Sequence, residues 1–113
     1  GKRILVLGVA YRGGVKETAF SGAIGVREAL AEREAVAQFA DPLYTDDELR
    51  AEGYEPWDGE QIDGVVVQAD HDEYREMTTA ATPGARAVVD GRGVLDQAAW
   101  ASAGIDVRRI GRS

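Results

Sequence analysis

The chain has 113 residues, no cysteine and a formal net charge of -7. Its length fits a single domain, residues 1–113, with a core of its own, and the lack of cysteine excludes disulfides, thiolate metal sites and a cysteine nucleophile. The acidic charge argues against nucleic acid as a partner, which requires clustered cations, and no apolar run approaches the roughly 18 residues of a membrane span. We therefore expect no nucleic-acid partner, no membrane partner and a cytoplasmic location by default.

The charged residues are uneven in kind as well as in number. Lys2 and Lys16 are the only lysines, and acids gather in TDDELRAEGYE (45–55) and ADHDEYREM (69–77). Such a composition is typical of halophilic proteins, whose acidic surfaces stay soluble in concentrated salt. An ordinary acidic surface is the alternative, so salt adaptation is a hypothesis here.

Short apolar runs alternate with helical patterns along the chain. The first run, RILVLG at 3–8, is continuous and too short for a helix, as expected of a parallel strand covered on both faces. After a glycine-bearing stretch and a first helix, the pattern predicts strands at 35–42, 62–69, 85–91 and 105–111, helices at 45–53, 72–81 and 95–104, and a minimal edge strand at 54–57. Strands separated by helices imply βαβ units. The predicted fold class is α/β, a Rossmann-like three-layer α/β/α sandwich with a mainly parallel sheet.

The first helix is predicted from its capping residue and its apolar stripe. Ser21 can cap a helix in which Ala23, Val26 and Leu30 follow at i, i+3 and i+7. Ile24 and Ala31 are predicted to widen this apolar stripe. Arg27 is predicted to lie outside it, on the solvent face of the helix.

The stretch between the first strand and the first helix is a candidate binding loop. Gly8 to Gly13 reads G-x-A-x-x-G, but the dinucleotide fingerprint needs its last glycine inside the helix, and a Walker A loop needs Gly-Lys-Ser/Thr where Gly13-Gly14-Val15 stands. The loop nevertheless ends at a helix N-terminus with free backbone N–H groups, which suits a phosphate. In parallel sheets, ligands bind outside the carboxyl ends of the strands. A loop without a ligand is the alternative.

Four stretches together resemble one family. LGVAYRGGVKETAFSGA (7–23), FADPL (39–43), VVVQADHDEYREM (65–77) and VVDGRGVLD (88–96) are similar, in this order, to the landmarks of the C-terminal, UDP-binding domain of UDP-glucose/GDP-mannose dehydrogenases. The resemblance covers nearly the whole chain, and its D-G-R segment is the most specific part.

The resemblance implies a function for a longer enzyme. Full-length members oxidise the C6 alcohol of a UDP- or GDP-sugar to a carboxylate in two NAD-dependent steps. Their NAD and catalytic cysteine lie in an N-terminal domain, which a central domain joins to the third. This chain is then expected to bind the nucleotide sugar, to hold no cofactor, metal or catalytic residue of its own, and to be inactive by itself. Its partners would be the N-terminal NAD-binding domain and the central domain of the same enzyme.

The same resemblance assigns the site residues. Tyr11 and Arg12 match an aromatic-lysine pair whose lysine contacts the nucleotide sugar, and Arg92 matches the arginine of D-G-R, another ligand contact. Gly13 and Gly14 continue the first loop, and His71 lies in a segment that faces the nucleotide in the family. Without the family, Arg12 is interpreted as a solvated cation, Arg92 as a partner of Asp90 or of a helix end, and His71 as a cap or polar rim residue. Asp41 is expected in an Asp-Pro turn, and Trp57 and Trp100 are interpreted as packing residues.

The sequence also departs from the family pattern. Lys16 and Glu17 stand where two aspartates are usual, Ala19 where an arginine is usual, and Gly22 where a proline normally starts the helix. Two alternatives therefore remain: a free-standing dinucleotide or regulatory nucleotide-binding module, and a degenerate interaction domain that binds no nucleotide. The pattern does not decide between a monomer and a dimer.

Overall fold

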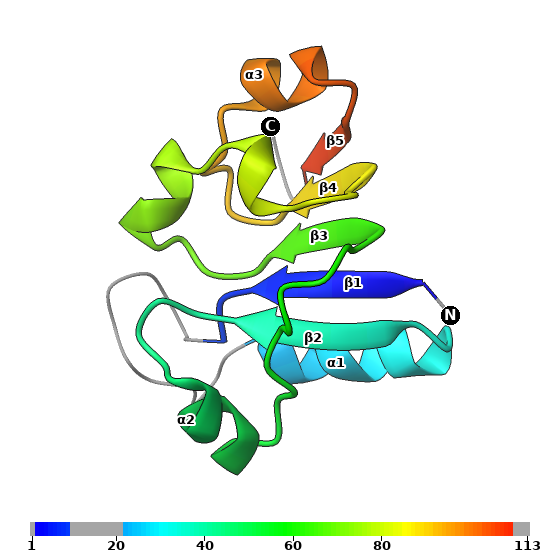
Figure 1. Cartoon of the computed structure of the whole chain (residues 1–113), viewed down its shortest axis with the longest axis vertical. Helices are drawn as coiled ribbons and strands as arrows, with labels where there is room; N and C mark the ends of the chain where they lie inside the picture. The colour runs from blue at the N-terminus through cyan, green and yellow to red at the C-terminus, as the bar shows by residue number, and fades with distance from the viewer. Residues whose placement is uncertain (1, 10–21, 110–113) are drawn as a thin grey trace.

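Five parallel strands form one sheet in the computed structural model of the chain, which describes residues 2–9 and 22–109 (Figure 1). The strands are β1 (Arg3–Leu7), β2 (Val36–Ala40), β3 (Gly64–Val67), β4 (Ala87–Asp90) and β5 (Asp106–Arg109), in the order β2-β1-β3-β4-β5. The helices are α1 (Ala23–Glu32), α2 (Asp46–Ala51) and α3 (Gln97–Ser102), with 3-10 helices η1 (Asp72–Glu76) and η2 (Thr79–Ala81). This α/β architecture confirms the predicted fold class.

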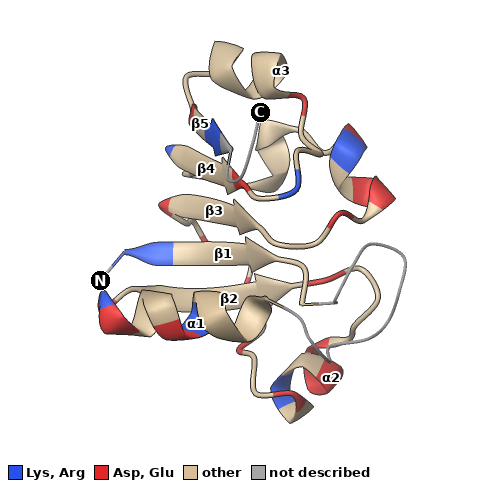
Figure 2. Ribbon diagram, turned by 180° about the vertical axis from the view of Figure 1, so that it is seen from behind, with Lys and Arg blue, Asp and Glu red and all other residues tan. Residues whose placement is uncertain are grey.

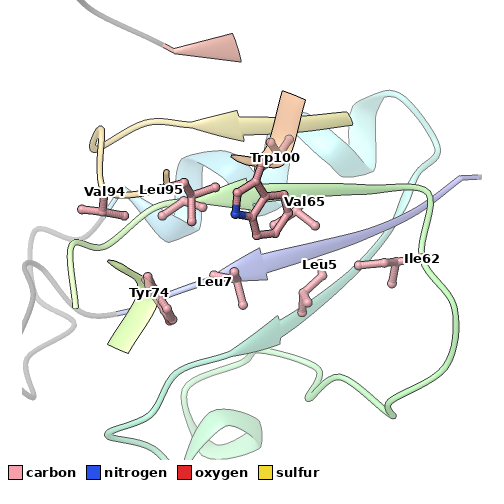
Figure 3. Packing of buried hydrophobic residues seen from close by; sticks show 10 residues of the cluster. Leu5, Leu7, Ile62, Val65, Tyr74, Val94, Leu95 and Trp100 are labelled. Atoms are coloured by element: carbon pink, nitrogen blue, oxygen red, sulfur yellow. The ribbon is translucent and has the colours of Figure 1, made fainter. Parts of the chain in front are cut away.

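Both faces of the sheet carry a hydrophobic cluster, which explains the continuous apolar run of β1. Leu5 and Leu7 point into one cluster and Val6 into the other, because successive side chains of a strand alternate between the faces. The first cluster includes Trp100 of α3 and Tyr74 of η1, and Figure 3 shows their side chains among those of the strands. The second cluster packs against α1 and α2 and contains Val6, Val9, Ala23, Phe39, Leu49 and Tyr54.

The first helix buries a narrower stripe than the sequence predicted. Ala23 is buried and Val26 and Leu30 are partly buried against the second cluster. Ile24 is 46% exposed and Ala31 is also exposed, so their place in the stripe was wrong. At about 100° per residue, both turn well away from the line through the other three side chains.

Arg27 connects α1 to the residues that follow α2, although it was predicted to face solvent. Its Nη1 donates to the Gly53 carbonyl at 2.6 Å, and its guanidinium lies 5.1 Å from the centre of the Tyr54 ring. The contact with the aromatic face is a cation–π interaction. A change at Arg27 therefore disturbs packing as well as charge.

Reciprocal hydrogen bonds define the start of α2. The Thr45 hydroxyl accepts from the Glu48 backbone N–H, and the Glu48 carboxylate accepts from the Thr45 backbone N–H. This capping box satisfies donors that the first turn leaves unpaired. The helix stops before Gly53, whose φ of 90° is in the left-handed region, as predicted from the glycine.

The segment predicted as a helix at 72–81 forms two short 3-10 helices instead. His71 O accepts from Tyr74 N at 3.0 Å, and Thr79 O accepts from Thr82 N at 3.1 Å. Met77 between them is extended and packs against the first cluster. The tertiary contacts of Tyr74 and Met77 thus outweigh the local helical pattern, as often happens where intrinsic propensity is weak.

The minimal strand predicted at 54–57 is confirmed as an isolated parallel bridge between Phe39 and Pro56. Phe39 N donates to Glu55 O at 2.8 Å and Trp57 N donates to Phe39 O at 2.9 Å. These bonds protect part of the outer edge of β2, which would otherwise offer unpaired backbone groups.

Tyr74→Phe should stabilise the protein by about 1 kcal/mol, because the Tyr74 hydroxyl is buried without a hydrogen-bond partner among the described residues. Burial, followed by the nearby charges of Asp41 and Glu73, raises the pKa of Tyr74, so this hydroxyl stays protonated. Thermal or urea unfolding measures the change. A variant less stable than the parent would show that the hydroxyl has a favourable interaction.

The acidic surface leads to a prediction about salt. Figure 2 shows acidic residues on α1, α2 and the segment that contains η1, while β1 is basic at its start and otherwise uncharged. If this surface is salt-adapted, the melting temperature should rise markedly between low and molar KCl, because a Debye length of about 3 Å at 1 M salt screens the repulsion between carboxylates. A melting temperature that does not respond to KCl would leave the ordinary acidic surface as the explanation.

Candidate functional site

The strand order marks one place at the carboxyl edge of the sheet. The chain moves from β1 outward to β2 and then back to β3 on the other side of β1, so the order reverses between β1 and β3. Crevices at such a point are where open parallel sheets bind ligands. Gly8 follows β1, Gln68 follows β3 and Asp90 ends β4 at this edge.

Gly8 lets the ends of β1 and β3 approach closely. Its φ is 99°, and a Cβ at this position would lie 2.5 Å from Ala69 Cβ and 2.8 Å from Ala69 N. Only glycine adopts this conformation without strain and leaves room for the neighbouring backbone. The glycine after the first strand therefore has a structural reason in addition to any role with a ligand.

Gln68 joins three segments at the reversal point. Its Nε2 donates to the Gly8 carbonyl at 3.0 Å, its Oε1 accepts from the Gly22 backbone N–H at 3.2 Å, and its own carbonyl accepts from Arg92 Nε at 2.9 Å. One residue thus connects the end of β1, the start of α1 and the segment after β4. Gln68 was not among the site residues predicted from the sequence.

One of the backbone donors that were expected to be free at the start of the first helix is already bonded. Gly22 is the N-cap residue of α1 and its N–H is already bonded to Gln68. The same contact gives a reason for Gly22 where the family usually has proline, because proline has no N–H to donate. A Cβ at Gly22 would also lie 3.0 Å from Gln68 Oε1.

Asp90 organises the D-G-R segment. Its carboxylate is fully buried and accepts from three backbone N–H groups, those of Arg92 at 3.2 Å, Gly93 at 2.8 Å and Leu95 at 2.9 Å. The turn holds Arg92 exposed at the rim while its Nε reaches back to Gln68. Arg92 therefore bonds to Asp90 through its backbone and uses its side chain elsewhere.

His71 occupies a different position from the one predicted. It is the N-cap residue of η1 but makes no capping bond with its side chain, and it is 1% exposed, so it is neither a side-chain cap nor a rim residue. Its Nε2 lies 3.0 Å from Asp41 Oδ2, and its ring meets the Tyr74 ring edge-on at 5.5 Å.

Asp41 forms the expected Asp-Pro turn and also makes contacts with Val9 and His71. Its Oδ1 accepts from Leu43 N at 2.9 Å, which confirms the turn. Its Oδ2 accepts from Val9 N at 2.8 Å and faces His71. The two tryptophans are packing residues as predicted, since Trp100 is 1% exposed and Trp57 packs against the same cluster.

The remaining predicted site residues, Tyr11, Arg12, Gly13 and Gly14, lie outside the described residues, as do Lys16, Glu17, Ala19 and Ser21. Within residues 2–9 and 22–109, no group of three or more His, Asp or Glu side chains could hold a metal ion. No helix in that part of the chain is long and apolar enough to cross a membrane.

A cavity of about 300 Å³ lies away from this edge of the sheet, between η1–η2 and α3. Met77, Asp96 and Trp100 are among its lining residues.

Comparisons with known proteins agree with this fold. Cap5O, a UDP-N-acetyl-mannosamine dehydrogenase from Staphylococcus aureus, has a native structure that superposes with a TM-score of 0.72 at 17% sequence identity, covering 99% of this chain and 27% of that one. A UDP-D-ManNAc dehydrogenase from Pyrococcus horikoshii gives 0.71 at 24% identity, covering 98% and 26%. This chain thus spans about a quarter of their length, and the likeness shows a shared fold.

No curated protein matches the chain. A family model described as the UDP-glucose/GDP-mannose dehydrogenase family, UDP binding domain, matches residues 5–97. The match runs from within β1 through β4 and includes Gln68 and the D-G-R segment. The chain therefore belongs to the UDP-glucose/GDP-mannose dehydrogenase family, as its UDP-binding domain.

Proposed function

We propose that this chain binds the UDP part of a nucleotide sugar at the carboxyl edge of its sheet, as one part of an NAD-dependent sugar-nucleotide dehydrogenase. The observation that carries the proposal is the junction at Gln68, where the end of β1, the start of α1 and Arg92 meet at the reversal of strand order. An exposed arginine at such a rim suits a diphosphate, because its planar guanidinium can bind phosphate oxygens in pairs.

Two features of the described part of this edge differ from those of a dinucleotide site. A dinucleotide fold places the pyrophosphate on a helix that starts directly after the first strand, and an acidic residue after the second strand binds the ribose. Here α1 begins only at Ala23. Asp41, which follows the second strand, is 6% exposed and directs both oxygens to Val9, Leu43 and His71. This geometry weighs against a free-standing dinucleotide-binding module.

The oxidation itself is then a property of a longer protein. We propose that NAD and the catalytic cysteine belong to an N-terminal domain and that a central domain completes the enzyme. Together they would oxidise the C6 alcohol of a UDP- or GDP-sugar to a carboxylate. This chain contributes binding and orientation of the nucleotide sugar, so the chain alone should bind UDP with micromolar to millimolar affinity and reduce no NAD.

Arg92→Ala should weaken binding of UDP by about 1.5–3 kcal/mol, which is roughly 10- to 150-fold, because it removes a charge-assisted hydrogen bond to the diphosphate. Arg92→Lys should fall between this variant and the parent, since lysine keeps the charge without the planar fork. Isothermal titration calorimetry or an NMR titration with UDP measures both changes.

Arg86→Ala is the matched control. Arg86 is exposed and directly precedes β4, at the end opposite Arg92, so this variant loses the same charge far from the proposed site. Equal affinity in the parent, Arg92→Ala and Arg86→Ala would contradict the proposed site. Titration of the parent with UDP-glucose, UDP-N-acetylmannosamine, GDP-mannose and NAD distinguishes a nucleotide-sugar domain from a dinucleotide module. Binding of none of them would indicate an interaction domain.

A further inference from the structure

A buried histidine and aspartate connect the ends of β2 and β3. His71 Nε2 and Asp41 Oδ2 are 3.0 Å apart, and the two side chains are 1% and 0% exposed. Asp41 directly follows β2, and His71 follows β3. Since β1 lies between these two strands, the pair spans the carboxyl end of β1.

The pair also holds the backbone that leaves β1. The same Oδ2 atom of Asp41 accepts from the Val9 N–H at 2.8 Å. Val9 is fully buried and follows Gly8, whose carbonyl is bonded to Gln68. His71 therefore acts on Val9 through one oxygen atom of Asp41, next to the junction that carries the proposed function.

The contacts of Asp41 Oδ2 also bear on which atom donates the hydrogen bond between the two side chains. An ionised carboxylate can only accept hydrogen bonds, and Oδ2 already accepts one from Val9. An ionised Asp41 therefore needs a donor at His71 Nε2, and this hydrogen bond orients Asp41 toward Val9. A donor at this position is required; an aromatic ring alone would leave a buried carboxylate oxygen with one partner fewer.

We propose that His71 and Asp41 are positioning residues for the nucleotide site: they fix Gly8 and Val9 at the end of β1, and thereby the geometry in which the edge binds UDP. This inference rests on the proposed function. His71 is buried in the protein and acts through Asp41 in this proposal, which is a different role from the substrate-binding one that the resemblance implies.

Two substitutions separate the hydrogen bond from the packing of the ring. His71→Phe keeps an aromatic ring beside Tyr74 but removes the donor, whereas His71→Gln keeps a donor and loses the ring. Ile62→Val is the control, because Ile62 is 3% exposed in the first cluster and precedes β3 at the opposite edge of the sheet. Amide hydrogen exchange at Val9, UDP affinity and global stability are measured for each variant.

We expect His71→Phe to increase the exchange rate at Val9 and the Kd for UDP by about tenfold or more. In His71→Gln, which keeps a donor, both values should stay within about threefold of the parent. Ile62→Val should lower global stability and leave both readouts near the parent values. Parent-like affinity and Val9 protection in His71→Phe would overturn the proposal. So would equal losses in all three variants, which would reflect stability alone.

If the proposed function is wrong, the parent protein will bind no UDP, and this result is visible before any variant is made. The positioning of a UDP site would then be overturned as well. Val9 exchange in the ligand-free variants would still show whether the pair fixes the backbone. If His71→Phe does not fold, the parent itself provides the test. The chain has one histidine, so its imidazole signals are assigned without ambiguity. We expect a slowly exchanging Nε2–H resonance, and ¹⁵N shifts that show Nε2 unprotonated would overturn the proposal.

Discussion

Gly8→Ala should lower the free energy of unfolding by roughly 3–5 kcal/mol, or prevent folding. Alanine at a φ of 99° is strained, and its Cβ would lie 2.5 Å from Ala69 Cβ and 2.8 Å from Ala69 N. Strain of the backbone costs about 1–3 kcal/mol and forced overpacking adds about 1–3 kcal/mol. Because the clash involves backbone, no rotation of a side chain relieves it. Urea unfolding measures the loss.

The same substitution at Gly25 is the control. Gly25 lies inside α1, and a Cβ there would meet no atom within 4 Å. Alanine is the better helix former, so Gly25→Ala should raise stability by about 0.5–1 kcal/mol. Opposite signs at the two glycines would show that the conformation and contacts at Gly8 matter rather than glycine content. A small effect of Gly8→Ala would mean that β1 and β3 can separate at this edge.

The fold was largely predictable because it depends on repeated local signals. Continuous apolar runs are needed wherever a strand is covered on both faces, and β1 shows this in the alternation of Leu5, Val6 and Leu7 between two clusters. The exceptions occur where distant contacts decide the conformation. Residues 72–81 follow a helical pattern, yet the burial of Tyr74 and the packing of Met77 divide them into η1 and η2.

The candidate site was predictable only in part, because it depends on the order of the strands. A pattern of alternating strands and helices predicts a parallel sheet but does not say which strands are neighbours. Asp41 and His71 are 30 positions apart and meet because β1 lies between β2 and β3. Gln68 is a polar residue at the end of a strand, and such a residue carries no signal of its own. The D-G-R segment was found because its residues are contiguous, and the roles of Arg92 and His71 in binding stay predictions.

Asp90→Ala should lower the free energy of unfolding by about 3–5 kcal/mol. The fully buried carboxylate accepts from the backbone N–H groups of Arg92, Gly93 and Leu95. A buried donor that loses its partner costs about 1–3 kcal/mol, and water entering the turn recovers part of this loss for Arg92 and Gly93. Asp90→Asn should lose less, because one oxygen can still accept from Arg92 and Gly93 while the amide group faces the Leu95 N–H. Thermal unfolding of the two variants measures this order.

Asp96→Ala is the control for Asp90→Ala, because Asp96 caps α3 from an exposed position with one bond, accepted from Ala99 N at 3.2 Å. Its loss should cost only about 1 kcal/mol. The two variants should also differ in UDP affinity. Asp90 fixes the turn from which Arg92 reaches Gln68, so folded Asp90→Asn protein should bind UDP more weakly than the parent, whereas Asp96→Ala should bind as the parent does. If Asp90→Asn is destabilised but binds UDP with parent affinity, the D-G-R turn supports the fold and not the site.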